Sequence, residues 1–489
     1  MRLIVVSNRL PMVIEKDENG EWSSNPSTGG LVSVLAPILK ERGGLWIGWP
    51  GTSDAPKEAV ESAMSEASSI AEIDFATVQL TSQEIDKYYA GFSNEILWPL
   101  FHDMIGKCNF DPEYWSSYQA VNRKFAAKIL ENLKPDDFVW IHDYHLLFVG
   151  QALREMGVKE RIGFFLHIPF PSPDIFLQLP WGLDILKSLL SLDLIGLQTL
   201  RDQRNFVQCV CKHMIDTNVE GSGQIITLLF GNREVRVGAL PIGIDYHDFA
   251  VSAASREVAE RAWYIHEKQG KRQIVLGIDR LDYTKGIPER LRAYRYALKA
   301  FPELCGKIVL FQVVVPSRHD IPKYEDLKEE IDRLVGNING EFGRFDWMPI
   351  HYFYRALSRE ELLAYYRTSE IALITPIKDG MNLIAKEFCA VSLERNSVLI
   401  LAESAGAADQ LQEGALMVNP NDQKAIAEAI YHAYKMPFAE RSERMDRMRD
   451  IIRQTDIRWW VKSFMKASFA ESIDYFYSVE DYRPQIDFD

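Results

Sequence analysis

The sequence has few cysteines and no long apolar segment. Five cysteines are spread over 489 residues, an odd and sparse set that fits a reducing compartment better than a disulfide framework. Cys209 and Cys211 lack the second cysteine pair or the histidines of a zinc site, so we expect both to pack in a helix. No apolar run reaches the roughly 18 residues of a membrane span, and the N-terminal run is too short for a signal peptide. These absences predict a cytoplasmic protein.

Basic residues are also in the minority. The chain has 55 Lys and Arg against 69 Asp and Glu, a formal net charge of −14. This acidic balance argues against nucleic acid or an anionic membrane as the partner. The remaining composition, 47% hydrophobic and 25% charged, is that of a globular protein and excludes a disordered or collagen-like chain. At about 100–200 residues per domain, the length predicts two or three domains.

The sequence lacks short repeats and a Pro- or Ser-rich linker. It contains instead a succession of short apolar segments, rich in β-branched residues and separated by stretches with helical spacing. The apolar segments are 3–7, 138–142, 162–168, 194–199, 274–278, 308–315, 371–375 and 397–401. Continuous apolar strands that alternate with helices are typical of parallel sheets covered on both faces. We therefore expect an α/β protein with doubly wound parallel sheets.

The alternation of strands and helices restarts near residue 245, which indicates a domain boundary. We expect an N-terminal domain over 1–245, a C-terminal domain over 246–455, and a terminal helix and tail over 456–489 that packs back on the N-terminal domain. Ligands of open parallel sheets bind at the carboxyl ends of the strands. The chemistry should therefore lie in the loops that follow the strands, in a cleft between the two domains.

Two of these loops carry candidate anion sites. Arg9 ends the first strand, and the Gly29-Gly30 pair that follows precedes a helix, where bare backbone N–H groups can approach a phosphate. Arg280 and Lys285 lie in a strand-to-helix loop, where cations would stabilise the charge on a diphosphate leaving group. The alternatives are a plain turn for the glycines and two solvated surface cations for the second loop.

A third loop, over 375–388, runs from an apolar strand through a glycine into a helix. The amides of Gly380, Met381, Asn382 and Leu383 would face a pyrophosphate at the helix start. Asp379 precedes the turn, and Glu387 lies one helical turn beyond Leu383, where its carboxylate could accept hydrogen bonds from ribose hydroxyls. The alternative is a capping aspartate and a surface glutamate.

Histidines and aromatic residues gather near other expected loops. His142, Asp143 and His145, and then His167, follow strands, but no further carboxylate cluster accompanies them, so we expect no metal. Aromatic faces beside an arginine suit a sugar phosphate. The candidates for such a pocket are Trp46, Trp49, Tyr88, Tyr89, Trp98 and Arg318; the alternative is that these aromatic residues belong to the core.

Taken together and in order, these motifs resemble a known family. They include SNRLP, GGLVSVL, WIGWPG, FSNEILWPLFH, WIHDYHLL, IGFFLHIPFPSPDIF, RLDYTKGIPERL and DGMNLIAKEF. The set is similar to the trehalose-6-phosphate synthases, retaining GT-B glycosyltransferases, over all but the tail of the chain. The resemblance implies two Rossmann-like domains that face a central cleft, the first binding the acceptor and the second the nucleotide sugar.

The resemblance also implies the reaction. Glucose would pass from a nucleotide-glucose, UDP-glucose above all, to glucose 6-phosphate, giving α,α-trehalose 6-phosphate and the nucleoside diphosphate. The leaving phosphate oxygen would remove the proton of the acceptor, with no covalent enzyme intermediate. The nucleotide sugar is a co-substrate, so no cofactor and no metal are expected. The cations would make the cleft positively charged although the protein as a whole has a negative net charge. The sequence leaves open whether the chain forms a homo-oligomer.

Residue by residue, the resemblance assigns roles to two groups. The donor group comprises Gly30, His167, Arg280, Lys285, Leu357, Leu362, Asp379, Gly380, Met381, Asn382, Leu383, Ile384 and Glu387. The acceptor group comprises Arg9, Trp49, Tyr89, Trp98, Asp143 and Arg318. Asp143, His167, Arg280, Lys285 and Asp379 would be the catalytic residues.

The sequence departs from the family pattern at Leu197, where Phe is usual, and at Lys378, where Arg is common. Three alternatives remain: a glucosylglycerol-phosphate synthase using ADP-glucose and glycerol 3-phosphate, a non-catalytic sugar-phosphate sensor, and a pseudo-glycosyltransferase that couples cyclitols. Arg9, Tyr89, Trp98 and Arg318 favour glucose 6-phosphate as the acceptor. The presence of Arg280, Lys285 and Asp379 favours an active enzyme over a sensor.

Overall fold

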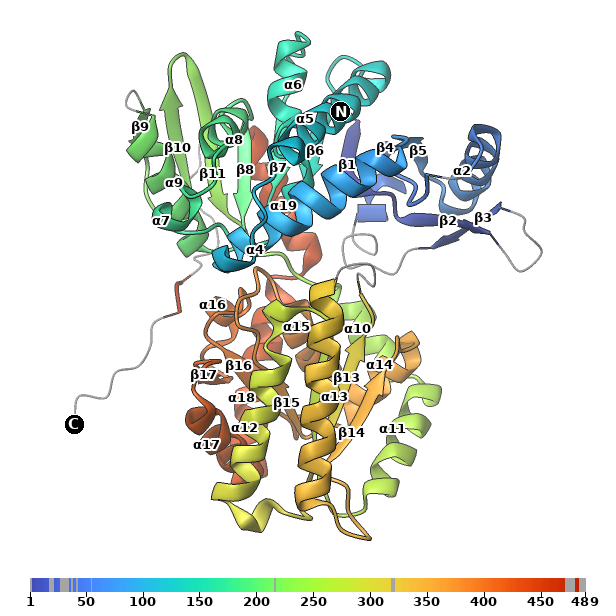
Figure 1. The fold of residues 1–489 in the computed structure, drawn as a ribbon, viewed down its shortest axis with the longest axis vertical. Helices are drawn as coiled ribbons and strands as arrows, with labels where there is room; N and C mark the ends of the chain where they lie inside the picture. The colour runs from blue at the N-terminus through green and yellow to red at the C-terminus, as the bar shows by residue number, and fades with distance from the viewer. Residues whose placement is uncertain are drawn as a thin grey trace. The chain divides into compact units, whose positions relative to one another are not determined.

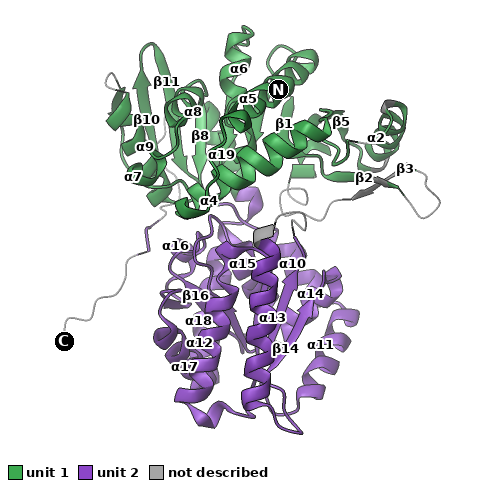
Figure 2. Cartoon of the chain, viewed as in Figure 1, with its two compact units in different colours: residues 1–241, 460–479 green, residues 242–459, 480–489 purple. Residues whose placement is uncertain are grey.

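The computed structural model describes residues 2–16, 22–26, 35–36, 38–40, 43–53, 55–214, 217–317, 322–470 and 480–482. Gly30 and Arg318, two of the predicted site residues, lie outside the described residues. The chain divides into two compact units (Figure 2). Unit 1 comprises residues 1–241 and 460–479, and unit 2 comprises residues 242–459 and 480–489.

Unit 1 is built on a nine-stranded sheet. Its strand order is β5 (Asp74–Thr77), β4 (Gly44–Trp49), β1 (Leu3–Arg9), β6 (Phe138–His142), β7 (Ile162–Phe165), β8 (Leu194–Leu197), β11 (Arg233–Ala239), β10 (Ile225–Phe230) and β9 (Thr217–Glu220). The strands from β5 to β11 run parallel, and β10 and β9 add an antiparallel edge. A separate hairpin pairs β2 (Met12–Lys16) with β3 (Trp22–Pro26).

Helices alternate with these strands along the chain (Figure 1). They are α2 (Lys57–Ala71), α3 (Ser82–Glu84), the π-helix η1 (Ile85–Leu97), α4 (Trp98–Phe101), η2 (Ile105–Lys107), α5 (Pro112–Asn132), η3 (Tyr144–Leu146), α6 (Val149–Glu155), α7 (Pro173–Phe176), α8 (Gly182–Leu189) and α9 (Leu200–His213). Among the described residues, no helix has both the length and the apolar character that a membrane span requires.

The end of the chain contributes to the core of unit 1. In α19 (Ile457–Phe469), Trp460 and Phe464 pack on Trp140 of β6, with ring centroids 5.0 and 4.2 Å away. A Cβ on Gly163 of β7 would come within 2.8 Å of the Phe464 ring, so the glycine makes room for the helix. The helix ends at Phe469, and residues 471–479 and 483–489 of the predicted tail lie outside the described residues.

Two details of the sequence interpretation need correction. Residues 44–49, expected near a loop, form the fully buried strand β4, because Leu45, Trp46 and Ile47 are apolar on both faces of the sheet. Trp46 is therefore a core residue. In α9, Cys209 is buried, and desolvation raises the pKa of its thiol to about 12, but Cys211 is exposed and does not pack in the core.

Unit 2 is built on a six-stranded sheet that is parallel throughout. Its order is β14 (Ile350–Tyr354), β13 (Ile308–Val315), β12 (Gln273–Arg280), β15 (Ile371–Ile374), β16 (Val398–Ala402) and β17 (Leu416–Val418). Numbered along the chain, this is the order 3-2-1-4-5-6 of the Rossmann fold. The helices are α10 (Tyr246–Ala253), α11 (Arg256–Gln269), η4 (Tyr283–Lys285), α12 (Ile287–Ala300), η5 (Pro302–Leu304), α13 (Pro322–Phe342), α14 (Arg359–Thr368), α15 (Leu383–Val391), α16 (Ala408–Leu411), α17 (Gln423–Lys435) and α18 (Phe438–Gln454).

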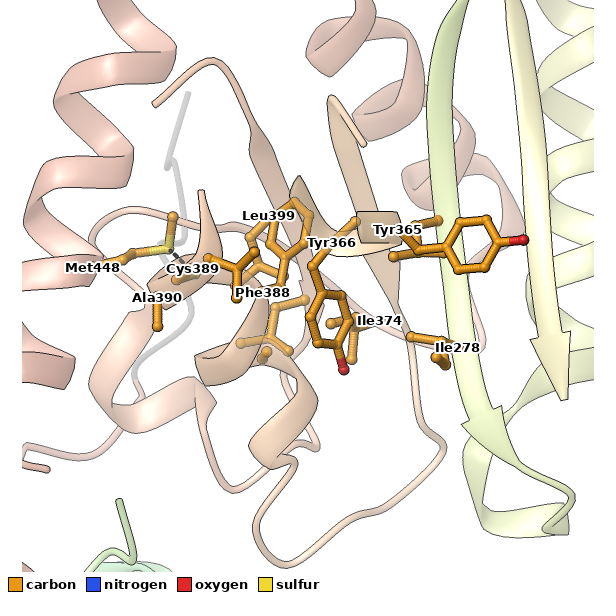
Figure 3. Packing of buried hydrophobic residues seen from close by; sticks show 14 of the residues in the cluster. Ile278, Tyr365, Tyr366, Ile374, Phe388, Cys389, Ala390, Leu399 and Met448 are labelled. Carbon is orange, nitrogen blue, oxygen red and sulfur yellow. Dashed lines mark hydrogen bonds between the residues drawn. The ribbon is translucent and has the colours of Figure 1, made fainter. Parts of the chain in front are cut away.

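Both faces of the unit 2 sheet are covered. Successive residues of β12 alternate between two apolar clusters: Ile274 and Leu276 belong to one, and Val275 to the other, as side chains on a strand must. Figure 3 shows part of the first cluster, where Phe388 and Cys389 of α15 pack near Met448 of α18. Two covered faces explain why the strands are apolar without alternation, and the predicted α/β, doubly wound fold is confirmed.

Candidate active site

The predicted polar residues lie at equivalent places in the two sheets. In unit 1 the winding direction reverses between the neighbours β1 and β6, and Arg9 ends β1 while Asp143 follows β6. In unit 2 it reverses between β12 and β15, and Arg280 ends β12 while Asp379 lies in the loop after β15. Ligands of open α/β sheets bind at these reversal points.

An ion pair lies at the centre of the predicted site residues of unit 2. Lys285 Nζ lies 2.5 Å from Asp379 Oδ2, and both side chains are largely buried, with exposures of 10% and 13%. Arg280, in contrast, is exposed at the end of its strand, and no described residue forms an ion pair with it. The pair places one cation in a fixed position, and Arg280 adds a second beside the same strand end.

Backbone contacts join the two loops that carry this pair. The Thr284 carbonyl, in the turn before Lys285, accepts hydrogen bonds from the Ile377 and Lys378 N–H groups at 2.8 and 3.3 Å. Gly286 has a φ of +63°, and a Cβ there would lie 2.6 Å from the Thr375 carbonyl oxygen. A glycine is therefore required for the close approach of the loops.

Asp379 also organises the start of α15. Its Oδ1 accepts hydrogen bonds from the N–H groups of Met381 and Asn382 at 3.2 and 3.3 Å, and its Oδ2 accepts one from Asn382 Nδ2. Asn382, in the left-handed region at φ 55°, caps the helix by accepting from the Ala385 N–H. Two of the amides that we predicted to face a pyrophosphate thus donate to Asp379 here, and their phosphate role stays a prediction.

The other predicted donor residues flank this loop. Gly380 is buried in the turn. Four partly buried apolar residues pack against the cluster of Figure 3, namely Leu357, Leu362, Leu383 and Ile384. Glu387 is half-buried and accepts a hydrogen bond from Tyr366 Oη at 2.9 Å; desolvation raises the pKa of its carboxyl. Tyr366, whose hydroxyl is visible in Figure 3, was not among the predicted residues.

In unit 1, an arginine stacked on aromatic rings replaces the ion pair. The Arg9 guanidinium carbon lies 4.7 Å from the Trp49 ring centroid and 5.4 Å from that of Tyr89. Arg9 and Trp49 are register partners on neighbouring strands, which explains why they meet. Tyr89 in turn stacks on His145 at 5.8 Å. An exposed cation above aromatic faces is suited to a phosphorylated sugar.

The remaining acceptor aromatics are more deeply buried. Trp98, which begins α4, is 5% exposed, and its ring lies 5.7 Å from that of Tyr144. Tyr144 donates to Asn94, and Asn94 donates to the Tyr89 carbonyl, so this network fixes Tyr89. Tyr88, also a pocket candidate, is fully buried and donates to Asn8, which makes it a core residue.

Asp143 and His167 follow the neighbouring strands β6 and β7. Asp143 has a φ of 75°, which is strained for a residue other than glycine, and its Oδ1 accepts a hydrogen bond from the His167 N–H at 3.3 Å. His142 Nδ1 lies 3.2 Å from His167 Nε2. Desolvation lowers the pKa of both imidazoles, that of His167 to about 3. His167 is therefore neutral near pH 7 and can exchange hydrogen bonds without carrying charge.

The described residues contain no group of three or more His, Cys, Asp or Glu arranged to hold a metal ion. The sequence profile of glycosyltransferase family 20 matches residues 1–469. The chain belongs to this family. Like other family 20 members described below, it folds as a GT-B protein with two Rossmann-like units.

Relatives of this family 20 chain have named activities. It is 40% identical over 468 residues to the UDP-forming α,α-trehalose-phosphate synthase A of Dictyostelium discoideum, matching 95% of the chain but 62% of that protein. It is 38% identical over 469 residues to the UDP-forming α,α-trehalose-phosphate synthase of Candida albicans, matching 95% of the chain and 96% of that protein.

Solved structures are similar over nearly the whole chain. A UDP-forming α,α-trehalose-phosphate synthase from Burkholderia xenovorans, in complex with glucose-6-phosphate, matches with a TM-score of 0.85 and 35% identity, over 96% of this chain and all of that one. An E. coli protein bound with UDP-2-fluoro glucose matches with a TM-score of 0.84 and 36% identity, over 96% of this chain and 99% of that one.

Proposed function

We propose that this family 20 chain is a trehalose-6-phosphate synthase that transfers glucose from UDP-glucose to glucose 6-phosphate. The products are α,α-trehalose 6-phosphate and UDP, and the anomeric configuration is retained. The observation that carries the proposal is the Lys285–Asp379 pair beside Arg280, at the strand reversal of unit 2. The named activities of the relatives support the same substrates.

Unit 2 holds the donor in this proposal. As the bond between the glucose C1 and the diphosphate oxygen breaks, negative charge grows on the diphosphate. Arg280 and Lys285 stabilise that charge, and Lys285 needs little reorganisation because Asp379 already fixes it. Asp379 accepts hydrogen bonds from the transferred glucose, Glu387 from the ribose, and Leu357 and Leu362 line the base.

Unit 1 holds the acceptor. Arg9 pairs with the phosphate of glucose 6-phosphate while Trp49 and Tyr89 support the guanidinium and face the sugar. Asp143 lies beside the attacking hydroxyl. The new bond forms from that hydroxyl oxygen to C1, and its proton passes to the departing diphosphate oxygen, so no enzyme base is needed. The neutral His167 donates to or accepts from the donor without competing for that proton.

We further infer that the enzyme works without a metal or cofactor, because Arg280, Lys285 and the α15 amides supply the positive field that the diphosphate requires. The proposed location is the cytoplasm, where both phosphorylated sugars are at hand, and the five described cysteines are free thiols. Oligomer formation stays a prediction.

A substrate matrix tests the function. UDP-, ADP- and GDP-glucose are each combined with glucose 6-phosphate and with glycerol 3-phosphate, and products are detected by mass. We expect trehalose 6-phosphate as the main product, formed fastest from UDP-glucose. Preferential formation of a glucosylglycerol phosphate from ADP-glucose, or no product from any pair, would overturn the proposal.

A further inference from the structure

A buried arginine behind the donor loops takes no part in the proposed chemistry. Arg290, in the first turn of α12, forms an ion pair with Asp279 of β12 at 2.7 Å, and the two side chains are 0% and 1% exposed. Charges this deeply buried are costly, and a well-packed apolar pair is often as stable. Stability alone therefore gives little reason for an ion pair at this place.

The guanidinium contacts a strand of the sheet and two of the loops that follow strands. Its Nε donates to Thr375 Oγ1 after β15 at 3.2 Å, its NH1 reaches Gln312 Oε1 of β13 at 3.5 Å, and its NH2 reaches the Lys285 carbonyl at 3.4 Å. Gly277 leaves room for this group, because a Cβ there would lie 2.5 Å from Gln312 Oε1 and 3.0 Å from Arg290 NH1.

Three of these contacts lead directly to donor residues. Asp279 is the residue before Arg280, Thr375 begins the loop that carries Asp379, and the third acceptor is the carbonyl of Lys285 itself. A planar guanidinium can hold several acceptors in one fixed geometry, which a lysine or an apolar side chain cannot. Desolvation raises the pKa of Asp279, and the adjacent Arg290 opposes that shift.

We propose that Arg290 is a positioning residue that fixes Arg280, Lys285 and Asp379 relative to one another before the donor binds. This inference rests on the proposed donor role of unit 2. In this proposal Arg280 and Lys285 contact the diphosphate, whereas Arg290 holds the loops that carry them in place. Displacement of catalytic groups by about 1 Å can cost about 100-fold in rate, so the loss of Arg290 should be visible in turnover.

The test compares Arg290→Lys, Arg290→Met and the double variant Asp279→Leu/Arg290→Met. The double variant removes both charges, so it should regain thermal stability that the Met single variant loses by leaving Asp279 unpaired. We expect kcat to stay at least about 10-fold below the wild-type value in all three variants that fold. If Arg290 were purely structural, the double variant would regain activity together with thermal stability, and that result would contradict the proposal.

Arg441 of α18 provides a matched control. It is a second buried arginine of unit 2 and donates to Gln273, at the opposite end of β12, and to backbone carbonyls such as that of Ala433. Arg441→Lys should lower thermal stability and leave kcat and the donor KM of the folded enzyme unchanged. The two hypotheses fail separately: a wild-type enzyme that forms no product contradicts the proposed function, whereas wild-type kcat in the stable double variant contradicts the role of Arg290.

A second, independent observation concerns the tail, which the family profile leaves out beyond residue 469. Tyr482 is half-buried against the apolar cluster of Figure 3. Its Oη donates to Glu403 at 2.8 Å, and its N–H donates to Asp409 Oδ1 at 2.9 Å. The tail thus contacts both ends of the segment 403–409.

The same segment supports the donor loop. Ser404 Oγ donates to the Pro376 carbonyl at 2.8 Å, the Asp379 N–H donates to the Ser404 carbonyl at 3.3 Å, and the Gly406 N–H donates to the Asp379 carbonyl at 2.8 Å. Asp379 is therefore held on its backbone by residues that Tyr482 and the tail contact. Glu403, which accepts the Tyr482 hydrogen bond, directly precedes Ser404 in the chain.

We infer that Tyr482 is a positioning residue of the donor site, acting through the segment 403–409 and resting on the same proposed function. Tyr482→Ala in the full chain should raise the donor KM by about 3-fold, the cost of a lost hydrogen bond. The donor KM of Tyr482→Phe should lie between that of the wild-type enzyme and that of Tyr482→Ala. The acceptor KM should stay unchanged in both variants. Tyr431→Phe is the control, because Tyr431 also bonds a glutamate, but this residue, Glu303, precedes a strand, β13, whereas Glu403 follows one, β16. A wild-type donor KM and UDP affinity in Tyr482→Ala would overturn the inference.

Discussion

The two units share one strand order around their reversal points, but different interactions hold the cation at each point. Unit 2 holds a buried cation against a carboxylate, Lys285 against Asp379, whereas unit 1 holds the exposed Arg9 above the rings of Trp49 and Tyr89. The charge on a donor diphosphate grows during the reaction, but the charge on an acceptor phosphate does not change. A fixed ion pair suits the first task, and an adaptable stacked arginine suits the second.

This difference has a kinetic consequence. Groups that interact more strongly with the transition state than with the substrate raise kcat, and groups that bind both equally lower KM. Changes in the unit 2 set should therefore appear mainly in kcat, and changes in the unit 1 set mainly in the KM for glucose 6-phosphate.

The largest expected effect comes from the donor cations. Lys285→Ala and Arg280→Ala should each lower kcat by about 100-fold or more, because each removes a charge that we propose to stabilise the leaving diphosphate. Steady-state assays at saturating substrates measure this. Lys299→Ala is the control, since Lys299 is an exposed cation at the other end of α12 that pairs with Glu341. A donor variant that retains most of the wild-type kcat would refute the diphosphate assignment.

A smaller effect, of a different kind, is expected in unit 1. Arg9→Ala should raise the KM for glucose 6-phosphate by about 10-fold, the cost of a charge-assisted hydrogen bond, with kcat nearly unchanged. Arg123→Ala serves as the control, because Arg123 also lies over an aromatic ring, that of Phe148, but is on helix α5 and is not a predicted site residue. An unchanged acceptor KM in Arg9→Ala would contradict the assignment of Arg9 to the acceptor site.

Removing a single hydrogen bond should cost less. Tyr366→Phe deletes the donor to Glu387 and leaves a half-buried carboxylate that must find another partner. In Tyr366→Phe we expect the KM for UDP-glucose to rise by about 3-fold and the KM for the acceptor to stay constant. The control is Tyr294→Phe, which loses a hydrogen bond to the Pro349 carbonyl on the other face of the sheet. This variant should leave both KM values unchanged. A rise in the acceptor KM of Tyr366→Phe would place Glu387 outside the donor site.

A last effect, on stability and not on catalysis, concerns the buried histidines of unit 1. The pKa of His167 falls from 6.5 to about 3 on folding, so below pH 6.5 the unfolded chain binds a proton that the folded chain rejects. The free energy of unfolding should therefore decrease as the pH is lowered from about 7 to 4. Denaturation curves across this range should show a shallower decrease for His167→Gln, and an identical decrease would contradict the neutral assignment.

The fold could be predicted well from the sequence where strands are continuously apolar. Segments such as Ile308–Phe311 in β13 and Ile371–Ile374 in β15 indicate sheets buried on both faces, which the structure confirms. Strand β4 was not among the predicted strands, and Trp46, a candidate for the acceptor pocket, lies in the core. The antiparallel edge of β9 and β10 was missed, and β9 in particular is short, largely exposed and mostly polar, so it lacks the apolar pattern of the predicted strands.

The site could be predicted only as separate loops. Lys285 and Asp379 are 94 positions apart, and only the adjacency of β12 and β15, which local pattern does not reveal, brings them together. The Asp279–Arg290 pair carries no sequence signal at all, because charged residues are ordinarily expected at the surface. Gly277 and Gly286 were visible as glycines, but their purpose depends on neighbours that only the folded chain supplies.

Titration of UDP into three forms of the enzyme tests the central claim most directly, because free UDP carries the charge that the transition state develops. The account predicts that Lys285→Ala binds UDP at least about 10-fold more weakly than the wild-type enzyme, whereas Arg9→Ala binds it with unchanged affinity. Equal weakening in both variants, or unchanged UDP affinity in Lys285→Ala, would contradict the division of roles between the two units.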